Sequence, residues 1–286
     1  MSIASNMSTF KENFSINLDF LKSKSPPLIG IDISASSVKM VELSHVGKGN
    51  QLYRMERYVI ESIPAEAVTE GNIVNMEVVS ECLQRGWRRM GTRLKNVSLA
   101  LPITDVITKR INVPAGQRED DLVFQVENEA SQYIPFSLDE VDLDFQVVGP
   151  TAENSDEVEV LIAASRKEKV EDRVAVALSA GLKTLVMDIE PYAAQSAFEL
   201  ALSQLPDGGK NQIIALVDIG STTIKMNVFY NSESVYTRDQ PFGGNQLTQE
   251  ISNQFNLPLE EAELAKRNGN LPENYKTDVL QPFCET

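Results

Sequence analysis

Short apolar runs separated by polar turns dominate the first third of the chain. They predict strands at residues 28–33, 38–43 and 52–60. Apolar residues then recur at helical spacing from Met76 to Met90, ahead of another predicted strand at 97–101. Strands that are joined both by hairpins and by a helix indicate an α/β domain.

From about Ile103 the pattern changes to that of an α+β insertion, which extends to Ala164. Its predicted elements are a strand at 106–113, a helix at 118–133 that Pro135 ends, and strands at 141–147 and 158–164. The α/β pattern then returns with a helix at 167–180, a strand at 182–189 and a helix opened by Pro191.

The run Pro-Asp-Gly-Gly at 206–209 is the best linker signal in the chain. After it we expect strands at 213–219, 224–230 and 235–240, helices from Asn245 and from Pro258 to Asn268, and a loop-like remainder at 269–286. The predicted division is a flexible arm (1–27), a first lobe (28–102 and 165–205), an inserted subdomain (103–164) and a second lobe (210–286).

Composition narrows the class of protein. The 286 residues include 42% apolar side chains and carry a formal net charge of -15, so a globular protein is indicated and nucleic acid is not an expected partner. A basic cluster, Arg85, Arg88, Arg89, Arg93 and Lys95, is interpreted as the solvated end of a helix. Two unpaired cysteines and no apolar run of about 20 residues predict a cytoplasmic protein that reaches a membrane only through partners.

The strongest signal is an internal repeat. Ile-Asp-Ile-Ser-Ala-Ser-Ser-Val-Lys-Met at 31–40 aligns without gaps to Val-Asp-Ile-Gly-Ser-Thr-Thr-Ile-Lys-Met at 217–226. Each copy is a strand, an aspartate, a turn of small residues and a second strand. One copy alone would favour a simple hairpin turn whose aspartate accepts local N–H bonds. Two copies, one in each lobe, favour a paired site.

A turn of small residues directs backbone N–H groups into one concavity, which binds phosphate oxygens. Ser36, Ser37, Thr222 and Thr223 add hydroxyl donors. Asp32 and Asp218, facing each other across a cleft, would hold Mg²⁺ largely through its waters. The repeat therefore predicts a site for a magnesium-bound nucleotide.

Paired loops of this kind resemble those of the superfamily of actin, sugar kinases and heat-shock chaperone ATPases. Within it the chain resembles the PilM family of type IV pilus assembly, which is itself similar to the division protein FtsA. The stretches that carry this resemblance are Gly-Ile-Asp-Ile-Ser (30–34), Glu-Ala-Ser-Gln-Tyr-Ile-Pro-Phe (129–136), Ala-Ala-Ser-Arg-Lys-Glu (163–168) and Phe-Gly-Gly-Asn-Gln-Leu-Thr (242–248). It implies a two-lobed, ribonuclease H-like duplicated actin fold with an inserted subdomain, and ATP with Mg²⁺ as cofactors.

The resemblance also assigns site residues. It implies a first phosphate loop at 32–39 and a second at 218–225. Glu190 falls where the family's first connector between lobes runs, and is a candidate to position Mg²⁺ or a water, or else a carboxylate favoured by the helix dipole. The implied nucleotide-binding residues are Asp32, Ser34, Ser36, Ser37, Lys39, Asp218, Gly220, Ser221, Thr222, Thr223, Gly243, Gly244, Glu263 and Lys266.

Two further pairs of residues among these assignments have plainer alternatives. Gly243 and Gly244 match glycines that approach the ribose and phosphates, or they are a flexible entry to a helix. Glu263 and Lys266 match contacts to ribose and adenine, or they form a surface ion pair.

Family chains also continue past residue 286, so we expect an unpaired sheet edge in the second lobe and weakened nucleotide binding.

The implied function is a cytoplasmic, nucleotide-responsive scaffold at the inner face of the inner membrane. In the family, a groove beside the insertion receives the cytoplasmic tail of the membrane protein PilN, and other pilus assembly proteins are further candidate partners. Tyr133 and Phe136 are candidates for this groove, unless they pack on their own helix.

The protein is expected to be at most a slow ATPase. A phosphotransferase, for which the single histidine His45 lies in a loop-like stretch, and a filament-forming actin relative are the alternatives.

Overall fold

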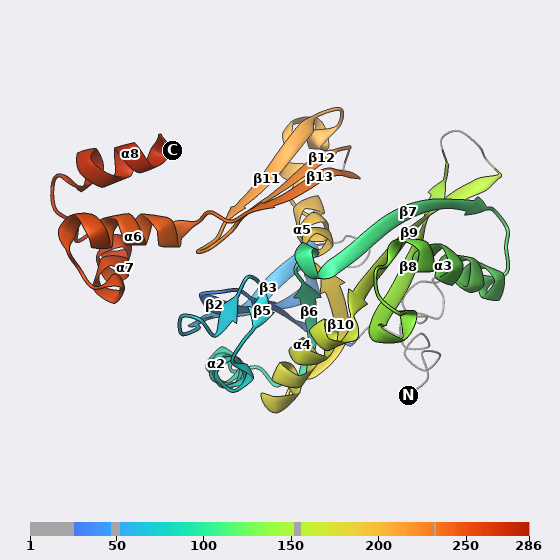
Figure 1. Cartoon of the computed structure of the whole chain (residues 1–286), viewed down its shortest axis with the longest axis horizontal. Coiled ribbons are helices and arrows are strands. Elements are labelled where there is room, and N and C mark those ends of the chain that lie inside the picture. The colour runs from blue at the N-terminus through green and yellow to red at the C-terminus, as the bar shows by residue number, and fades with distance from the viewer. Residues whose placement is uncertain (1–25, 47–51, 152–155, 232, 286) are drawn as a thin grey trace.

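The computed structural model describes residues 26–46, 52–151, 156–231 and 233–285. The described chain forms a five-stranded sheet, two three-stranded sheets and a two-stranded hairpin, and a group of helices ends it (Figure 1). The predicted arm at 1–27 lies outside the described residues except for Pro26 and Pro27.

A five-stranded sheet forms the centre of the first lobe. Its order is β10-β6-β1-β2-β3, and its strands are β1 (Ile29–Ile33), β2 (Ser37–Val46), β3 (Leu52–Ser62), β6 (Asn96–Leu101) and β10 (Lys183–Ile189). β1, β2 and β3 are joined by hairpins and pair antiparallel, whereas β6 and β10 run parallel to β1. Parallel neighbours need long crossovers, which helices and the insertion supply here. All five predicted strands are confirmed.

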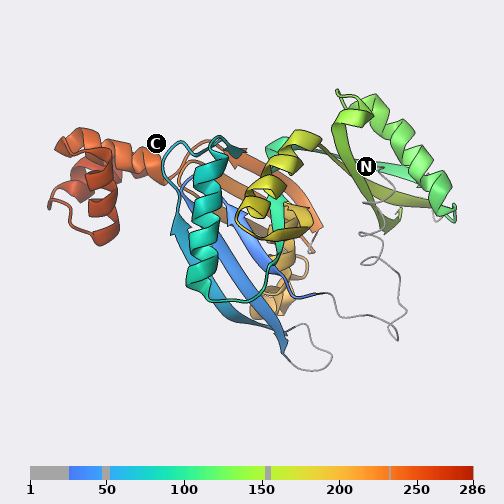
Figure 2. The same ribbon diagram turned by 90° about the horizontal axis from the view of Figure 1, so that it is seen from below.

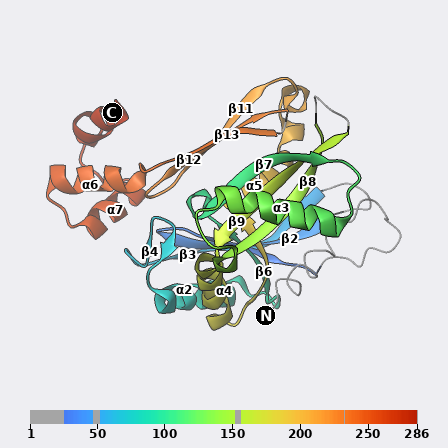
Figure 3. The same cartoon turned by 45° about the vertical axis from the view of Figure 1, so that its right-hand side comes forward.

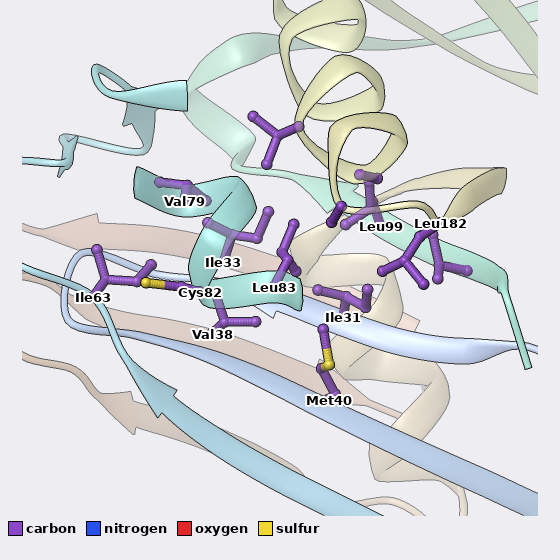
Figure 4. Close-up of a cluster of buried hydrophobic side chains, with 14 of the residues drawn as sticks. Ile31, Ile33, Val38, Met40, Ile63, Val79, Cys82, Leu83, Leu99 and Leu182 are labelled. Carbon is purple, nitrogen blue, oxygen red and sulfur yellow. The ribbon is translucent and has the colours of Figure 1, made fainter. Parts of the chain in front are cut away.

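Helices α2 (Met76–Met90) and α4 (Lys167–Ser179) cover one face of this sheet (Figures 2 and 4). Asn75 caps α2 by accepting a hydrogen bond from the Val78 amide at 3.1 Å, and Gly91 ends it with a φ of 66°. The core between the helices and the sheet includes Ile31, Ile33, Val38, Met40, Val79, Leu83, Leu99, Val176 and Leu182. Each fully buried apolar side chain of this size contributes about 1.5–3 kcal/mol.

A small hairpin, β4 (Val68–Thr69) and β5 (Asn72–Ile73), precedes α2 and was not predicted. Gly71 forms its turn with a φ of 80°, and a Cβ at this glycine would lie 2.9 Å from Cγ of Pro102. The hairpin therefore packs tightly against the segment that leaves β6.

The insertion is a three-stranded antiparallel sheet with one helix. A short 3₁₀ turn (Ile103–Asp105) leads into β7 (Val106–Pro114), and α3 (Glu119–Tyr133), β8 (Val141–Pro150) and β9 (Glu157–Arg166) follow. The order β7-β9-β8 places β9 in the middle, and α3 buries Val126 and Ala130 in a core shared with Val113 and Val160. This confirms the predicted α+β character.

Helix α5 (Glu190–Glu199) connects the first lobe to the second sheet, which consists of β11 (Ile213–Ile219), β12 (Ile224–Tyr230) and β13 (Glu233–Gln240) (Figure 3). The ring of Phe198 on α5 stacks on Phe229 of β12, with 5.0 Å between centroids. The predicted linker at 206–209 forms a tight turn in which Gly209 is buried.

Helices α6 (Gly244–Phe255), α7 (Leu259–Asn268) and α8 (Gln281–Cys284) lie beyond one end of the second sheet (Figures 1 and 3). A π-helical turn (Lys276–Leu280) precedes α8. The group has its own small core, formed by Ile251, Ala262 and Val279. The prediction of a loop-like stretch at 269–286 is wrong for Lys276–Cys284, because Val279 anchors these turns to α6.

Two other details differ from or refine the sequence analysis. His45 lies within β2 rather than in a loop, because β2 continues its pairing with β3 to Val46; its ring is 4.4 Å from that of Tyr53. The basic cluster is exposed as expected, but Arg85 and Arg89 also pair with Glu61 on β3. Among the described residues, none of the helices combines the length and apolar character needed to cross a bilayer.

Candidate functional site

The first loop, residues 32–39, joins β1 to β2. The Ser34 amide donates to the Ser37 carbonyl at 3.0 Å, and the Ser34 hydroxyl donates to the same oxygen at 2.9 Å. Within the described structure, the amides of Ala35 and Ser36 donate no hydrogen bond to a protein atom. They are therefore free to bind phosphate oxygens.

The second loop, residues 218–225, is closed in the same way. The Gly220 amide donates to the Thr223 carbonyl at 3.0 Å, which is the same bond displaced by 186 residues. A Cβ at Gly220 would lie 2.8 Å from that carbonyl oxygen, so glycine permits the close turn. Among the described residues, the amides of Ser221 and Thr222 again have no protein acceptor.

The two copies of the repeat also have the same strand register. Asp32 pairs with Lys39 across β1 and β2, and Asp218 pairs with Lys225 across β11 and β12. In the first loop this register brings Lys39 Nζ to 2.6 Å from a carboxylate oxygen of Asp32. In the second loop the lysine side chain points elsewhere, and the exposed Asp218 carboxylate makes no hydrogen bond or ion pair with the described residues.

Lys225 instead forms an ion pair with Glu190, the first residue of α5. Glu190 is thus at the start of a helix, as expected, and its side chain contacts a loop of the second lobe. Its side chain is mostly buried, with 18% exposed, so solvent screens this pair less than the Lys39–Asp32 pair.

The start of α6 is fastened to the second loop. The amides of Gly244 and Asn245 donate to the carbonyl oxygens of Gly220 and Ser221, at 3.0 and 2.8 Å. A Cβ at Gly243 would lie 2.6 Å from the Gly220 oxygen, whereas one at Gly244 would make ordinary contacts from 3.6 Å. The first glycine is thus required by close packing against the loop, and it is not a flexible hinge.

Glu263 and Lys266 on α7 form part of a network at the start of α6. Lys266 Nζ contacts Glu263 at 2.6 Å, the Gly244 carbonyl at 2.9 Å and the Thr248 hydroxyl at 2.5 Å. Burial raises the pKa of Glu263, but hydrogen bonds from Lys266, Thr248 and Arg267 outweigh it and lower the pKa to about 2. The pair is therefore more than a surface ion pair.

No group of three or more His, Cys, Asp and Glu side chains converges among the residues that the structure describes. Asp32 and Asp218 supply one carboxylate per lobe, which fits Mg²⁺ held mainly through water and phosphate oxygens rather than in a protein cage. Together with the free amides and two lysines, the residues present fit a magnesium-bound phosphate chain.

A pocket of about 130 Å³ lies where the insertion meets the first lobe. Its apolar lining includes Ile107, Ile134 and Val141, and its charged lining comprises Asp105, Arg166 and Lys169. Phe136 also lines it and carries the Arg166 guanidinium at 5.2 Å from its ring. Tyr133 is not a lining residue, and Lys109 lies over its ring at 4.6 Å. We refer to this pocket as the insertion groove.

Arg173 on α4 was not among the residues expected to be important from the sequence, yet it is only 3% exposed. A signal for it existed. Arg173, Val176, Ala177 and Ala180 recur at the spacing of one helical face, and all four are buried. A charged residue on an apolar face is a candidate for a specific partner.

The chain is similar to known proteins of pilus assembly and cell division. The family described as type IV pilus assembly protein PilM matches residues 30–286. The solved structure of a PilM-PilN type IV pilus biogenesis complex is 26% identical, with a TM-score of 0.70, covering 91% of this chain and 75% of that chain. The cell division protein FtsA of Bacillus subtilis (strain 168) is 24% identical over 268 residues, which are 84% of this chain. The chain spans 57% of that relative's length.

The duplicated hairpins, the inserted subdomain and the family match agree with one another. The fold is the expected two-lobed, actin-like fold with an inserted subdomain, and the chain belongs to the family of the type IV pilus assembly protein PilM.

Proposed function

We propose that this chain is a cytoplasmic, nucleotide-binding scaffold of the type IV pilus inner-membrane complex, which holds the tail of a PilN-like membrane protein. The observation that carries the nucleotide half is the pair of loops closed by the same hydrogen bond, each with two free amides. The family match and the similarity to a PilM in complex with PilN support the partner half.

In this proposal the two lobes, divided as the sequence predicts, share one Mg-ATP. Bound Mg-ATP supplies a phosphate chain and a divalent cation at the cleft. The amides and hydroxyls of both loops and the ammonium groups of Lys39 and Lys225 bind phosphate oxygens, while Asp32 and Asp218 accept hydrogen bonds from water around the cation. Glu190 would position a water or the cation, Gly243 and Gly244 would lie near the ribose and phosphates, and Glu263 and Lys266 would contact the ribose and adenine.

The partner half of the proposal assigns the PilN-like tail to the insertion groove. Ile107, Ile134 and Phe136 offer apolar contacts to a short peptide, and Arg166 and Lys169 offer hydrogen-bond donors to its carbonyl groups. Binding there would recruit the protein to the inner face of the membrane through its partner.

The phosphotransferase alternative loses one candidate general base, His45. His45 lies eight residues along β2 from Ser37, which corresponds to about 26 Å at the usual rise per residue. The single histidine of the sequence is therefore too far from the first loop to act as a general base there.

The test is a calorimetric titration of a synthetic PilN tail peptide into the full chain. Ile107→Asp is expected to weaken binding at least tenfold, because it places a carboxylate in the apolar lining. Asn112→Asp, an exposed position on the same strand, adds the same charge outside the groove and should have little effect. Absence of binding by the unmodified chain, or equal binding by Ile107→Asp, would refute the partner assignment.

A further inference from the structure

Two segments of the first lobe are free of acidic residues. The chain has 41 Asp and Glu residues among 286, yet none falls within residues 82–104 or 173–187. The first segment holds the end of α2 and all of β6, and the second holds the end of α4 and most of β10. This part of the lobe is therefore locally basic in a chain with a net charge of -15.

The fold brings the basic residues of these two segments together. β6 and β10 are parallel neighbours, so the turns that precede them lie at the same edge of the five-stranded sheet. At the start of the two strands, the Lys183 amide donates to the Lys95 carbonyl at 2.7 Å. We refer to the exposed cations of this edge, Arg88, Arg93, Lys95 and Lys183, as the basic patch.

The turn between α2 and β6 holds part of the patch in a fixed position. The Trp87 indole N–H donates to the Leu94 carbonyl at 2.7 Å, and the Leu94 amide donates to the Thr92 hydroxyl at 3.1 Å. Lys95 Nζ lies 5.8 Å from the centre of the Trp87 ring. The cations of this turn are therefore presented on an ordered surface.

Within the described structure, none of the four cations of the basic patch forms an ion pair, whereas Arg85 and Arg89 on α2 pair with Glu61. The dipole of α2 favours a cation in its last turn, which accounts for Arg88. This effect falls off beyond the last turn, so it does not account for the three cations that follow α2 or lie on β10. Helix stability therefore leaves most of the patch unexplained.

We propose that the basic patch contacts the anionic headgroups of a lipid bilayer. Charge complementarity gives the class of ligand, because anionic lipids attract Lys and Arg side chains near the membrane surface. The inference rests on the proposed function for its choice of a bilayer over an acidic protein segment, since that function places the chain at the inner face of the membrane. The contact adds to recruitment through the tail and does not replace it.

The strongly acidic remainder of the chain does not prevent this contact. Charges in water are screened beyond about 10 Å at 0.1 M salt, so the bilayer interacts mainly with the edge of the protein that faces it. Binding should therefore require anionic lipid and should weaken as the salt concentration rises.

The experiment sediments the full chain with vesicles of phosphatidylcholine, alone or mixed with an equal part of phosphatidylglycerol, in the absence of nucleotide and tail peptide. We expect binding to the anionic vesicles only. The double variant Arg93→Gln, Lys183→Gln removes two exposed charges of the patch and should weaken binding about tenfold or more. The matched control Lys210→Gln, Lys276→Gln makes the same change of charge at exposed positions of the second lobe and should bind like the unmodified chain.

Equal binding by the patch variant and the control overturns the inference. So does a lack of binding by the unmodified chain, which would favour an acidic protein segment as the partner, or release from the vesicles by soluble glycerol phosphate, which would indicate a site for free phosphate esters. If the double variant does not fold, as judged by circular dichroism, the two single variants decide in the same way. The vesicles carry no tail peptide, so failure here leaves the proposed function intact, and failure of the tail titration is a separate result.

Discussion

Lys225 of the second loop forms an ion pair with Glu190 at the first turn of α5, so a cation of one lobe is held by a carboxylate of the other. In the first loop the matching lysine, Lys39, stays with its own aspartate, Asp32. The two loops thus share a backbone geometry but differ in the partner of their lysine. A nucleotide would have to draw Lys225 away from Glu190.

Removal of this competition should be measurable. Glu190→Gln is expected to tighten Mg-ATP binding about threefold, because Lys225 is then free to bind phosphate oxygens, and to slow any ATP hydrolysis that the unmodified chain shows. Glu199→Gln, at the exposed end of α5, serves as the control. Calorimetry gives the affinity and phosphate release the rate. A tenfold loss of affinity in Glu190→Gln would show instead that Glu190 holds the cation directly.

The packing of α6 on the second loop gives a second prediction. Gly243 has an extended backbone that any residue adopts, so only the 2.6 Å approach to the Gly220 oxygen demands glycine. Gly243→Ala is expected to lower the free energy of unfolding by about 1–3 kcal/mol and to weaken Mg-ATP binding. Urea denaturation followed by circular dichroism measures the first effect.

Gly244→Ala is the matched control, because its Cβ would meet nothing closer than 3.6 Å. It should change the free energy of unfolding by less than about 1 kcal/mol. Equal losses in the two variants would mean that close packing on the loop is not what selects glycine at position 243.

Glu263 predicts a pH dependence. Its pKa is about 2 in the folded chain against an ordinary 4.5, so its ionised form stabilises the fold above pH 4.5. This contribution is lost as the pH falls from about 4.5 to about 2. The difference in unfolding free energy between the unmodified chain and Glu263→Gln should shrink over that window. Glu260→Gln, exposed on the same helix, should show no such trend, and a pH-independent difference for Glu263→Gln would refute the assignment.

The duplicated hairpin shows what the sequence can and cannot predict. Strand limits, turn closure and register follow from local patterning and agree in both copies. Coverage does not. Ile31 and Ile33 are 6% and 4% exposed beneath α2 and α4, but their counterparts Val217 and Ile219 are 50% and 70% exposed, and β11 pairs only with β12 among the described strands. The difference arises because α6, α7 and α8 lie beyond the sheet instead of over it.

In the candidate site, too, the local features could be predicted from the sequence and the tertiary contacts could not. The loop residues could be chosen from the repeat, because the same local sequence closes the same turn twice. The ion pair of Glu190 with Lys225 and the burial of Arg173 could not, since both depend on segments that only the tertiary fold brings together. The β4–β5 hairpin was missed because two-residue strands have no detectable period.

We propose that two loops, one from each lobe, hold a single phosphate chain. Calorimetric titration of Mg-ATP into the unmodified chain and into Lys39→Met and Lys225→Met tests it, with Lys210→Met, an exposed lysine outside both loops, as the control. We predict one Mg-ATP per chain, about a tenfold loss of affinity in each loop variant, as expected for a charge-assisted hydrogen bond, and no loss in the control. Unchanged affinity in either loop variant, or no binding by the unmodified chain, would contradict the claim.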